Sequence, residues 1–114
     1  MKLYTYALAP NPRRVGLMMK YKGIELETQE IDLAAKEQFS PEFSAVNPRL
    51  TLPSLVFDDG AIISDTIAIC LYLDEVYPGA SVFGQSSLER AHVIGWCHRI
   101  FFEGFSAVAE VLRN

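Results

Sequence analysis

The sequence predicts an α/β domain with elements in the order βαβ–α–ββα, followed by one long helix. Three observations lead to this prediction. Two segments with alternating apolar and polar residues flank a helix-like segment near the N-terminus. A second pair of short strands surrounds Asp58-Asp59-Gly60, a composition typical of hairpin turns. Residues 87–114 then carry apolar side chains at helical spacing.

The N-terminal segments predict a strand–helix–strand unit. Residues 2–7 alternate and are rich in Tyr and Thr, which favours a strand. Asn11-Pro12 suits the N-cap and first turn of a helix that continues over 13–22, and Gly23 suits its left-handed end. Residues 24–33 alternate again. Because a helix separates the two strands, we expect them to pair in parallel.

The middle of the chain predicts the remaining elements of a four-stranded mixed sheet. A short helix is expected to begin at Ser40-Pro41-Glu42 and to end at Asn47-Pro48. Strands are predicted at 53–57 and 61–64, joined by the hairpin turn. Residues 65–76 are apolar on more than one side, which indicates a largely buried helix. The predicted organisation is therefore a domain over 1–78, a linker over 79–86 and one helix over 87–114.

Composition and charge exclude several classes of function. The net charge of -4 argues against a general affinity for nucleic acid. No apolar run of about 18 residues predicts a membrane span, and the N-terminal residues lack the charge order of a signal peptide. Cys70 and Cys97 lie in apolar helical stretches without a CxxC motif, so we expect two buried thiols in a reducing compartment. The expected location is the cytoplasm.

The first part of the chain is basic. Residues 1–24 contain Lys2, Arg13, Arg14, Lys20 and Lys22 and no acidic residue. Such a segment either favours an anionic ligand near the start of the first helix or is simply a solvated helix face.

The segment from Asn47 to Leu73 carries a resemblance to a known family. Its parts are Asn47-Pro48, Leu52-Pro53, the Asp59-Gly60 hairpin, Asp65-Thr66, and Ala68-Ile69 with Tyr72-Leu73. Together they resemble the N-terminal half of the cytosolic glutathione S-transferases, and the resemblance extends over the whole chain. It implies a thioredoxin-like domain followed by the first helix of an otherwise missing all-α domain. It also implies an incomplete chain, a homodimer and a role in detoxification.

The resemblance implies a set of glutathione-binding residues. Around a cis Leu52-Pro53 bond, the backbone of Leu52 would pair with the cysteinyl residue of glutathione. Asp65 and Thr66 would hold the ammonium and carboxylate of the γ-glutamyl end, and Gln38 would meet the glycyl carboxylate. Purely structural alternatives exist for two of these features. Pro53 could be a trans proline at the start of a strand, and Asp65 could be an ordinary acidic N-cap. Glutathione would be a co-substrate, with no other cofactor and no metal.

The residue that activates the thiol is left open by the sequence. Ala9 lies where the resemblance leads one to expect a catalytic serine. Two donors remain: the amide of Asn11, and the hydroxyl of Tyr6 at the end of the first strand. Asn11 is equally suited to be an N-cap, and Tyr6 to be a packed aromatic residue.

The sequence therefore predicts an enzyme that transfers glutathione to a small electrophile. The alternative is a non-catalytic glutathione-binding or regulatory relative of the same fold, which the absence of Ser or Cys at the thiol position favours. A thiol-disulfide oxidoreductase is a third possibility, against which the lack of a CxxC motif argues.

Overall fold

The computed structural model describes residues 1–113, and the chain divides into two compact units, Met1–Gly79 and Ala80–Asn114. The first unit contains four strands and three α-helices, together with a 3-10 helix at Glu37–Phe39. The strands are β1 (Lys2–Thr5), β2 (Glu27–Glu30), β3 (Ser54–Val56) and β4 (Ile62–Ile63), and the helices are α1 (Pro10–Lys22), α2 (Pro41–Val46) and α3 (Thr66–Val76).

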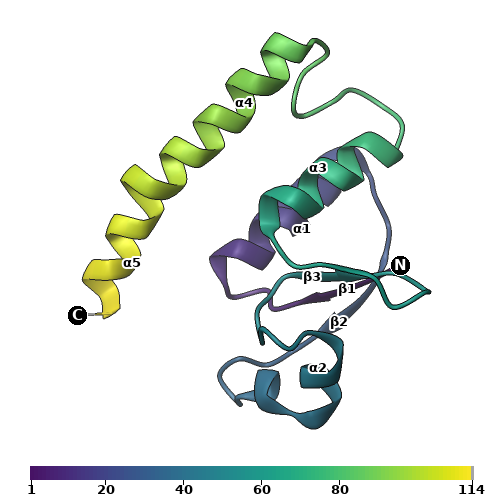
Figure 1. The fold of residues 1–114 in the computed structure, drawn as a ribbon, viewed down its shortest axis with the longest axis vertical. Helices are drawn as coiled ribbons and strands as arrows, with labels where there is room; N and C mark the ends of the chain where they lie inside the picture. The colour runs from purple at the N-terminus through teal and green to yellow at the C-terminus, as the bar shows by residue number, and fades with distance from the viewer. Residues whose placement is uncertain (114) are drawn as a thin grey trace. The chain divides into compact units, whose positions relative to one another are not determined.

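The four strands form one mixed sheet in the order β2-β1-β3-β4. β1 pairs with β2 in parallel, whereas β3 is antiparallel to both β1 and β4. Helices α1 and α3 lie on one side of the sheet and α2 on the other (Figure 1). The predicted βαβ–α–ββα order and the mixed four-stranded sheet are confirmed.

The main core lies between the sheet and the pair α1 and α3. Leu3 and Leu55 are cross-strand partners and are almost fully buried. Helix α1 contributes Val15 and Met19 at helical spacing, and α3 contributes a buried apolar set (Ile69, Cys70 and Leu73). On the opposite side of the sheet, the rings of Tyr4 and Phe43 meet with their centroids 5.7 Å apart. The opposite faces of β1 therefore pack against different helices.

Helix α1 begins earlier than predicted. Ala9 is its N-cap and Pro10 its first residue, so Asn11 lies inside the first turn and the N-cap interpretation of Asn11 is wrong. The φ angle of proline is preset for a helix, which lets Pro10 begin the helix without a capping side chain. At the other end Gly23 has φ 66°, and the predicted left-handed cap is confirmed.

Strand β2 is shorter than the predicted span of residues 24–33. It forms only over Glu27–Glu30, at the edge of the sheet, with all four side chains exposed. Ile24 belongs to the end of α1, because its N–H donates to the Met19 carbonyl at 2.9 Å. After the strand, Oδ1 of Asp32 accepts from the N–H groups of Ala34 and Ala35 and turns the chain.

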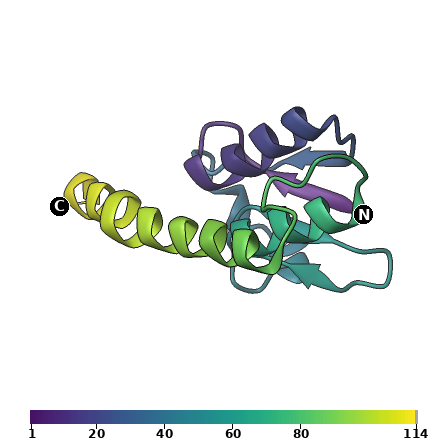
Figure 2. The ribbon, with the colours of Figure 1, turned by 90° about the horizontal axis from the view of Figure 1, so that it is seen from above.

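The second unit contains helix α4 (Ser87–Ile100), a π-helical turn (Phe101–Phe105) and helix α5 (Ser106–Arg113), which follow one another as a single rod (Figure 2). The predicted long helix is confirmed over the described residues 87–113, with a π-helical turn inside it at Phe101–Phe105, and position 114 lies outside the described residues. Gly104 lowers the helix propensity there, and the rings of Phe101 and Phe105 stack 5.4 Å apart across the turn.

The two cysteines differ in exposure. Neither forms a disulfide bond within the described residues; Cys70 is buried, whereas Cys97 on α4 is half-buried. The prediction of two buried thiols is wrong for Cys97, because much of α4 is exposed and none of its side chains is classed as buried. No helix in the described part of the chain is long and apolar enough to cross a bilayer.

Candidate glutathione-binding site

The segments that carry the candidate residues meet at one end of the sheet. Tyr4 of β1 pairs with Ser54 of β3, and Leu55 pairs with Ile63 of β4. The carboxyl ends of β1 and β4 therefore lie beside the amino end of β3. Because α1 follows β1 and α3 follows β4, both helices begin at this end, beside the turn that precedes β3 (Figure 1).

The segment with Gln38 leaves the sheet from the same end. β2 runs parallel to β1, and Thr5 pairs with Glu30 at their carboxyl ends. A carboxylate oxygen of Glu30 also accepts from the N–H of Ala7, at 2.9 Å, and so ties the loop after β1 to β2. The four segments predicted to bind glutathione therefore all lie at the same end of the sheet. They are the loop before α1, the segment with Gln38, the turn before β3 and the start of α3.

Among the described residues, the first turn of α1 has one backbone N–H group that is left without a partner. Pro10 and Pro12 have no N–H, and the N–H of Arg13 donates to the Ala9 carbonyl at 3.1 Å. The backbone N–H of Asn11 has no partner among residues 1–113. Asn11 is therefore where an anion can be held at this helix N-terminus.

The side chain of Asn11 is oriented by Arg14. Nη1 of Arg14 donates to Oδ1 of Asn11 at 3.1 Å. A guanidinium group only donates hydrogen bonds, so the atom facing it must be the amide oxygen. The Nδ2 group of Asn11 is left as a donor with no partner among the described residues.

Ala9 and Tyr6 flank the start of α1. The N–H of Ala9 donates to the Tyr6 carbonyl at 3.1 Å, which closes a tight turn. Tyr6 lies beyond the end of β1 and is half-buried, and its hydroxyl has no partner within residues 1–113. Ala9 occupies the N-cap without a side-chain oxygen. Tyr6 stays the second candidate for thiol activation.

The turn before β3 is held by a buried amide. The Leu52-Pro53 bond is cis, as expected from the resemblance, and Pro53 is buried. Nδ2 of Asn47 lies 3.0 Å from the Thr51 carbonyl oxygen, 3.1 Å from Oγ1 of Thr51 and 3.0 Å from Oγ of Ser54. The N–H and carbonyl of Leu52 have no hydrogen bond to another described residue. They are therefore available to an extended peptide.

The start of α3 combines a cap with two unpartnered donors. Oδ1 of Asp65 accepts from the N–H of Ile67 at 2.9 Å and of Ala68 at 3.2 Å, so the N-cap interpretation of Asp65 is confirmed. Its carboxylate is exposed, and Oδ2 has no partner in the described part of the chain. The hydroxyl and N–H of Thr66 are also unpartnered within residues 1–113. Oδ2 of Asp65 can therefore accept from a cation, while the N–H and hydroxyl of Thr66 beside it can hold an anion.

Gln38 has the weakest geometry of the candidates. Its Oε1 is buried and has no hydrogen-bond partner among residues 1–113. A carboxylate needs a donor, so only Nε2 of Gln38 can hold the glycyl end. The neighbouring Phe39 is 62% exposed and cannot donate.

A separate pocket of about 420 Å³ lies on the α2 side of the sheet. It is lined by Tyr4, Ile31 and Phe43 and by the carboxylates of Glu37 and Glu42. None of the candidate glutathione ligands lines it. Two carboxylates repel a ligand with two carboxylates of its own, so this pocket is a poorer candidate for glutathione than the helix N-termini are.

Comparison with known proteins identifies the family. Residues 9–76 match the family model described as "Glutathione S-transferase, N-terminal domain". The chain belongs to the glutathione S-transferase family. It is 35% identical to glutathione S-transferase Z1 of Arabidopsis thaliana over 80% of this chain and 41% of that protein. It is 32% identical to maleylacetoacetate isomerase of Pseudomonas aeruginosa over 83% of this chain and 46% of that protein.

A solved structure agrees with the family assignment. The crystal structure of a class Gtt2 glutathione S-transferase of Vibrio parahaemolyticus matches with a TM-score of 0.88 and 35% identity, over all of this chain and 57% of that one. The chain spans less than half the length of the two curated relatives.

Two features of the site were missed from the sequence. The contact of Arg14 with Asn11 could have been predicted, because residues three positions apart lie on the same face of a helix. From the sequence, we interpreted Arg14 only as part of the basic segment. The bonds from Asn47 to Thr51 and Ser54 had no such signal, because they depend on how the turn before β3 folds back.

Proposed function

We propose that this chain binds glutathione at the N-termini of α1 and α3 and activates its thiol for attack on a small electrophile. The supporting observation is the convergence of unpartnered groups at one end of the sheet. Asn11 and Thr66 offer donors, Leu52 offers a backbone edge, and Asp65 offers a free carboxylate oxygen. Each chemical group of a γ-Glu-Cys-Gly peptide except the glycyl carboxylate then has a partner of the right kind among these four residues.

In the proposed complex the peptide lies across the turn before β3. The cysteinyl N–H and carbonyl pair with the backbone of Leu52, as in the addition of a strand. The γ-glutamyl carboxylate meets the N–H and hydroxyl of Thr66, and the ammonium meets Oδ2 of Asp65. The glycyl carboxylate is assigned to Nε2 of Gln38.

Thiol activation is assigned to Asn11. A free thiol has a pKa of about 8.5, and lowering it by about two units requires roughly 2.7 kcal/mol of preferential thiolate stabilisation. A hydrogen bond to a charged group contributes about 1.5–3 kcal/mol, and a helix N-terminus adds about 0.3–1 kcal/mol. A hydrogen bond from Nδ2 of Asn11 at the start of α1 is therefore large enough to lower the pKa of the thiol by about two units.

The proposed reaction needs no protein base at the sulfur. The thiol proton leaves to solvent, and the thiolate held by Asn11 attacks the electrophilic carbon. A carbon–sulfur bond forms, and the leaving group departs with its electron pair. Positioning and thiolate stabilisation are the contributions of the chain. The electrophile, the homodimer and the cytoplasmic location stay predictions from the family.

The alternative, a glutathione-binding relative without turnover, is favoured by one observation, the absence of a hydroxyl or thiol at Ala9. Calorimetric titration of glutathione into the chain tests the binding, and conjugation of a model electrophile tests the activity. Binding with turnover that is lost in Asn11→Ala supports the transferase. Binding without turnover supports the alternative, and no binding by the folded chain refutes both.

A further inference from the structure

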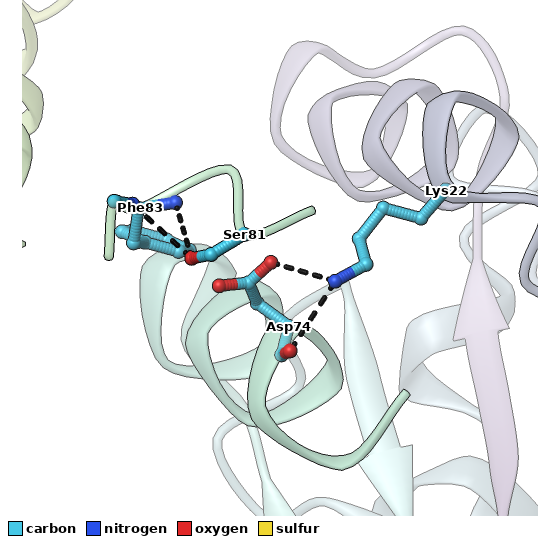
Figure 3. A network of polar contacts seen from close by, with 5 residues as sticks. Lys22, Asp74, Ser81 and Phe83 are labelled. Atoms are coloured by element: carbon cyan, nitrogen blue, oxygen red, sulfur yellow. Dashed lines mark hydrogen bonds and ion pairs between the residues drawn. The ribbon is translucent and has the colours of Figure 1, made fainter. Parts of the chain in front are cut away.

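The ends of α1 and α3 are joined by a buried ion pair. Nζ of Lys22 lies 2.8 Å from Oδ1 of Asp74 and 3.2 Å from the carbonyl oxygen of the same residue. The two side chains are only 2% and 1% exposed. Figure 3 shows Lys22 extending from α1 to one carboxylate oxygen and the main-chain carbonyl oxygen of Asp74 on α3. The solvated-face interpretation of the basic segment is therefore wrong for Lys22.

The pair lies at the far ends of the two helices from the candidate site. α1 and α3 pack against each other and both begin at the same end of the sheet, so they run in parallel (Figure 1). At 1.5 Å per residue, Lys22 lies roughly 17 Å along α1 from Asn11. Asp74 lies roughly 14 Å along α3 from Asp65.

The other buried side chains that these two helices contribute to the core are mostly apolar, such as Val15 and Met19 of α1 and Ile69 and Leu73 of α3. Apolar contacts are non-directional, so they define the axial position of one helix against the other less sharply than a hydrogen-bonded ion pair does. The ion pair is directional, and one of its two hydrogen bonds ends on the main chain of α3. A bond to a main-chain oxygen fixes the helix itself, whatever rotamer the Asp74 side chain adopts.

We propose that the Lys22–Asp74 ion pair is a positioning device that sets the axial register of α1 against α3. Through that register it sets the separation between the donors of Asn11 and the carboxylate site of Thr66. This inference rests on the proposed function, in which one glutathione molecule must reach both helix N-termini. Lys22 and Asp74 touch no substrate and act only through the helices that they join.

The decisive variant is Lys22→Met/Asp74→Asn, which removes both charges with little change in shape. Asn keeps an oxygen at the position of Oδ1, so other contacts of Asp74 retain an acceptor. Removing both partners avoids the buried unpaired charge that either single substitution leaves. The matched control is Lys2→Met/Glu27→Gln, which removes a more exposed ion pair of 3.8 Å between β1 and β2, with side chains 32% and 71% exposed.

Two properties of the complex are measured for the wild type and both variants. The dissociation constant of glutathione is obtained by calorimetry. The pKa of the bound thiol is obtained from the ultraviolet absorbance of the thiolate as the pH rises. A misplacement of about 1 Å can cost up to a hundredfold in a positioned reaction, and we expect about tenfold weaker binding in the decisive variant. Its bound thiol should also have a higher pKa, while the control matches the wild type.

The outcomes separate positioning from simple stabilisation. A folded variant with weaker binding and a raised thiol pKa supports the proposal. A folded variant that binds glutathione as the wild type does, with the same thiol pKa, overturns it and leaves the pair a purely structural contact. Failure of the wild-type chain to bind glutathione overturns the proposed function and this inference together.

Hydrogen exchange in the wild type decides the question if the variant does not fold. Coupling is reciprocal, so glutathione must stabilise the ion pair as the pair assists glutathione. Binding should slow amide exchange at residues 20–23 and 73–77 more than in the edge strand Glu27–Glu30. Equal effects in these segments overturn the proposal.

Discussion

Substitution of Asn47 by Ala should destabilise the first unit and weaken glutathione binding together. Asn47 is 2% exposed and joins the end of α2 to the turn before β3. Its Nδ2 contacts two oxygens of Thr51 and one of Ser54, and its Oδ1 accepts from the N–H of Arg49 at 3.0 Å. The extended φ of -134° at Asn47 suits Ala, so the effect comes from the lost side chain.

The size of the loss follows from the hydrogen bonds. An amide NH₂ has two hydrogens, so the three acceptors around Nδ2 count as about two bonds, and the Arg49 N–H adds one. At about 1 kcal/mol each, the free energy of unfolding should fall by about 3 kcal/mol. Oγ of Ser54 keeps its own bond to the Thr51 carbonyl at 2.9 Å, which limits further loss.

Thermal and urea unfolding, followed by circular dichroism, measure the effect. About 3 kcal/mol corresponds to a fall in Tm of roughly 12–24 °C for a domain of about 100 residues. The matched control is Ser44→Ala on the same helix, which removes one exposed bond to the Pro41 carbonyl and should change stability by less than about 0.5 kcal/mol.

Calorimetry on the folded variant at low temperature tests the second part of the prediction. The Leu52 backbone edge loses the support of Asn47, and the affinity for glutathione should fall several-fold relative to Ser44→Ala. A loss of stability below about 1 kcal/mol would refute the reasoning, because the buried amide bonds would then contribute no net stability. Full glutathione affinity would refute the role of Asn47 in holding the turn.

Three further substitutions separate the roles of individual residues. Asp65→Asn keeps a good N-cap but removes the charge, so Tm should stay within about 2 °C while glutathione affinity falls about fivefold by calorimetry. Ala9→Ser supplies a capping oxygen and a second thiol donor; we expect about 0.5–1 kcal/mol of added stability and faster conjugation of a model electrophile. Leu73→Ala removes a fully buried side chain, and urea unfolding should show a loss of about 2–5 kcal/mol.

Each of these three predictions can be contradicted by a specific result. Unchanged affinity in Asp65→Asn would mean that the carboxylate only caps α3. A fall in stability or no gain in rate in Ala9→Ser would mean that the loop before α1 cannot direct a hydroxyl at the thiol. A small effect of Leu73→Ala would place the core elsewhere than between the sheet and α3.

The elements that the sequence predicted well are those whose signals lie within a few consecutive residues. The alternation in β1, the hairpin at Asp58-Asp59-Gly60, the glycine cap at Gly23 and the Asp65 N-cap all depend on local geometry and local hydrogen bonds. The cis Leu52-Pro53 bond was expected from the family resemblance rather than from such a local signal. The errors in element bounds include the start of α1 at Pro10, where one proline outweighed a good capping residue.

The sequence by itself was therefore enough to predict the order of strands and helices and most of the residues proposed to bind glutathione. Only the tertiary structure decided which groups are free and which are partnered. Lys22 and Asp74 are 52 residues apart, and nothing local marks either as buried. Their pairing depends on two helices that lie in parallel on one sheet, because burial of a charge is stable only where the fold brings its partner.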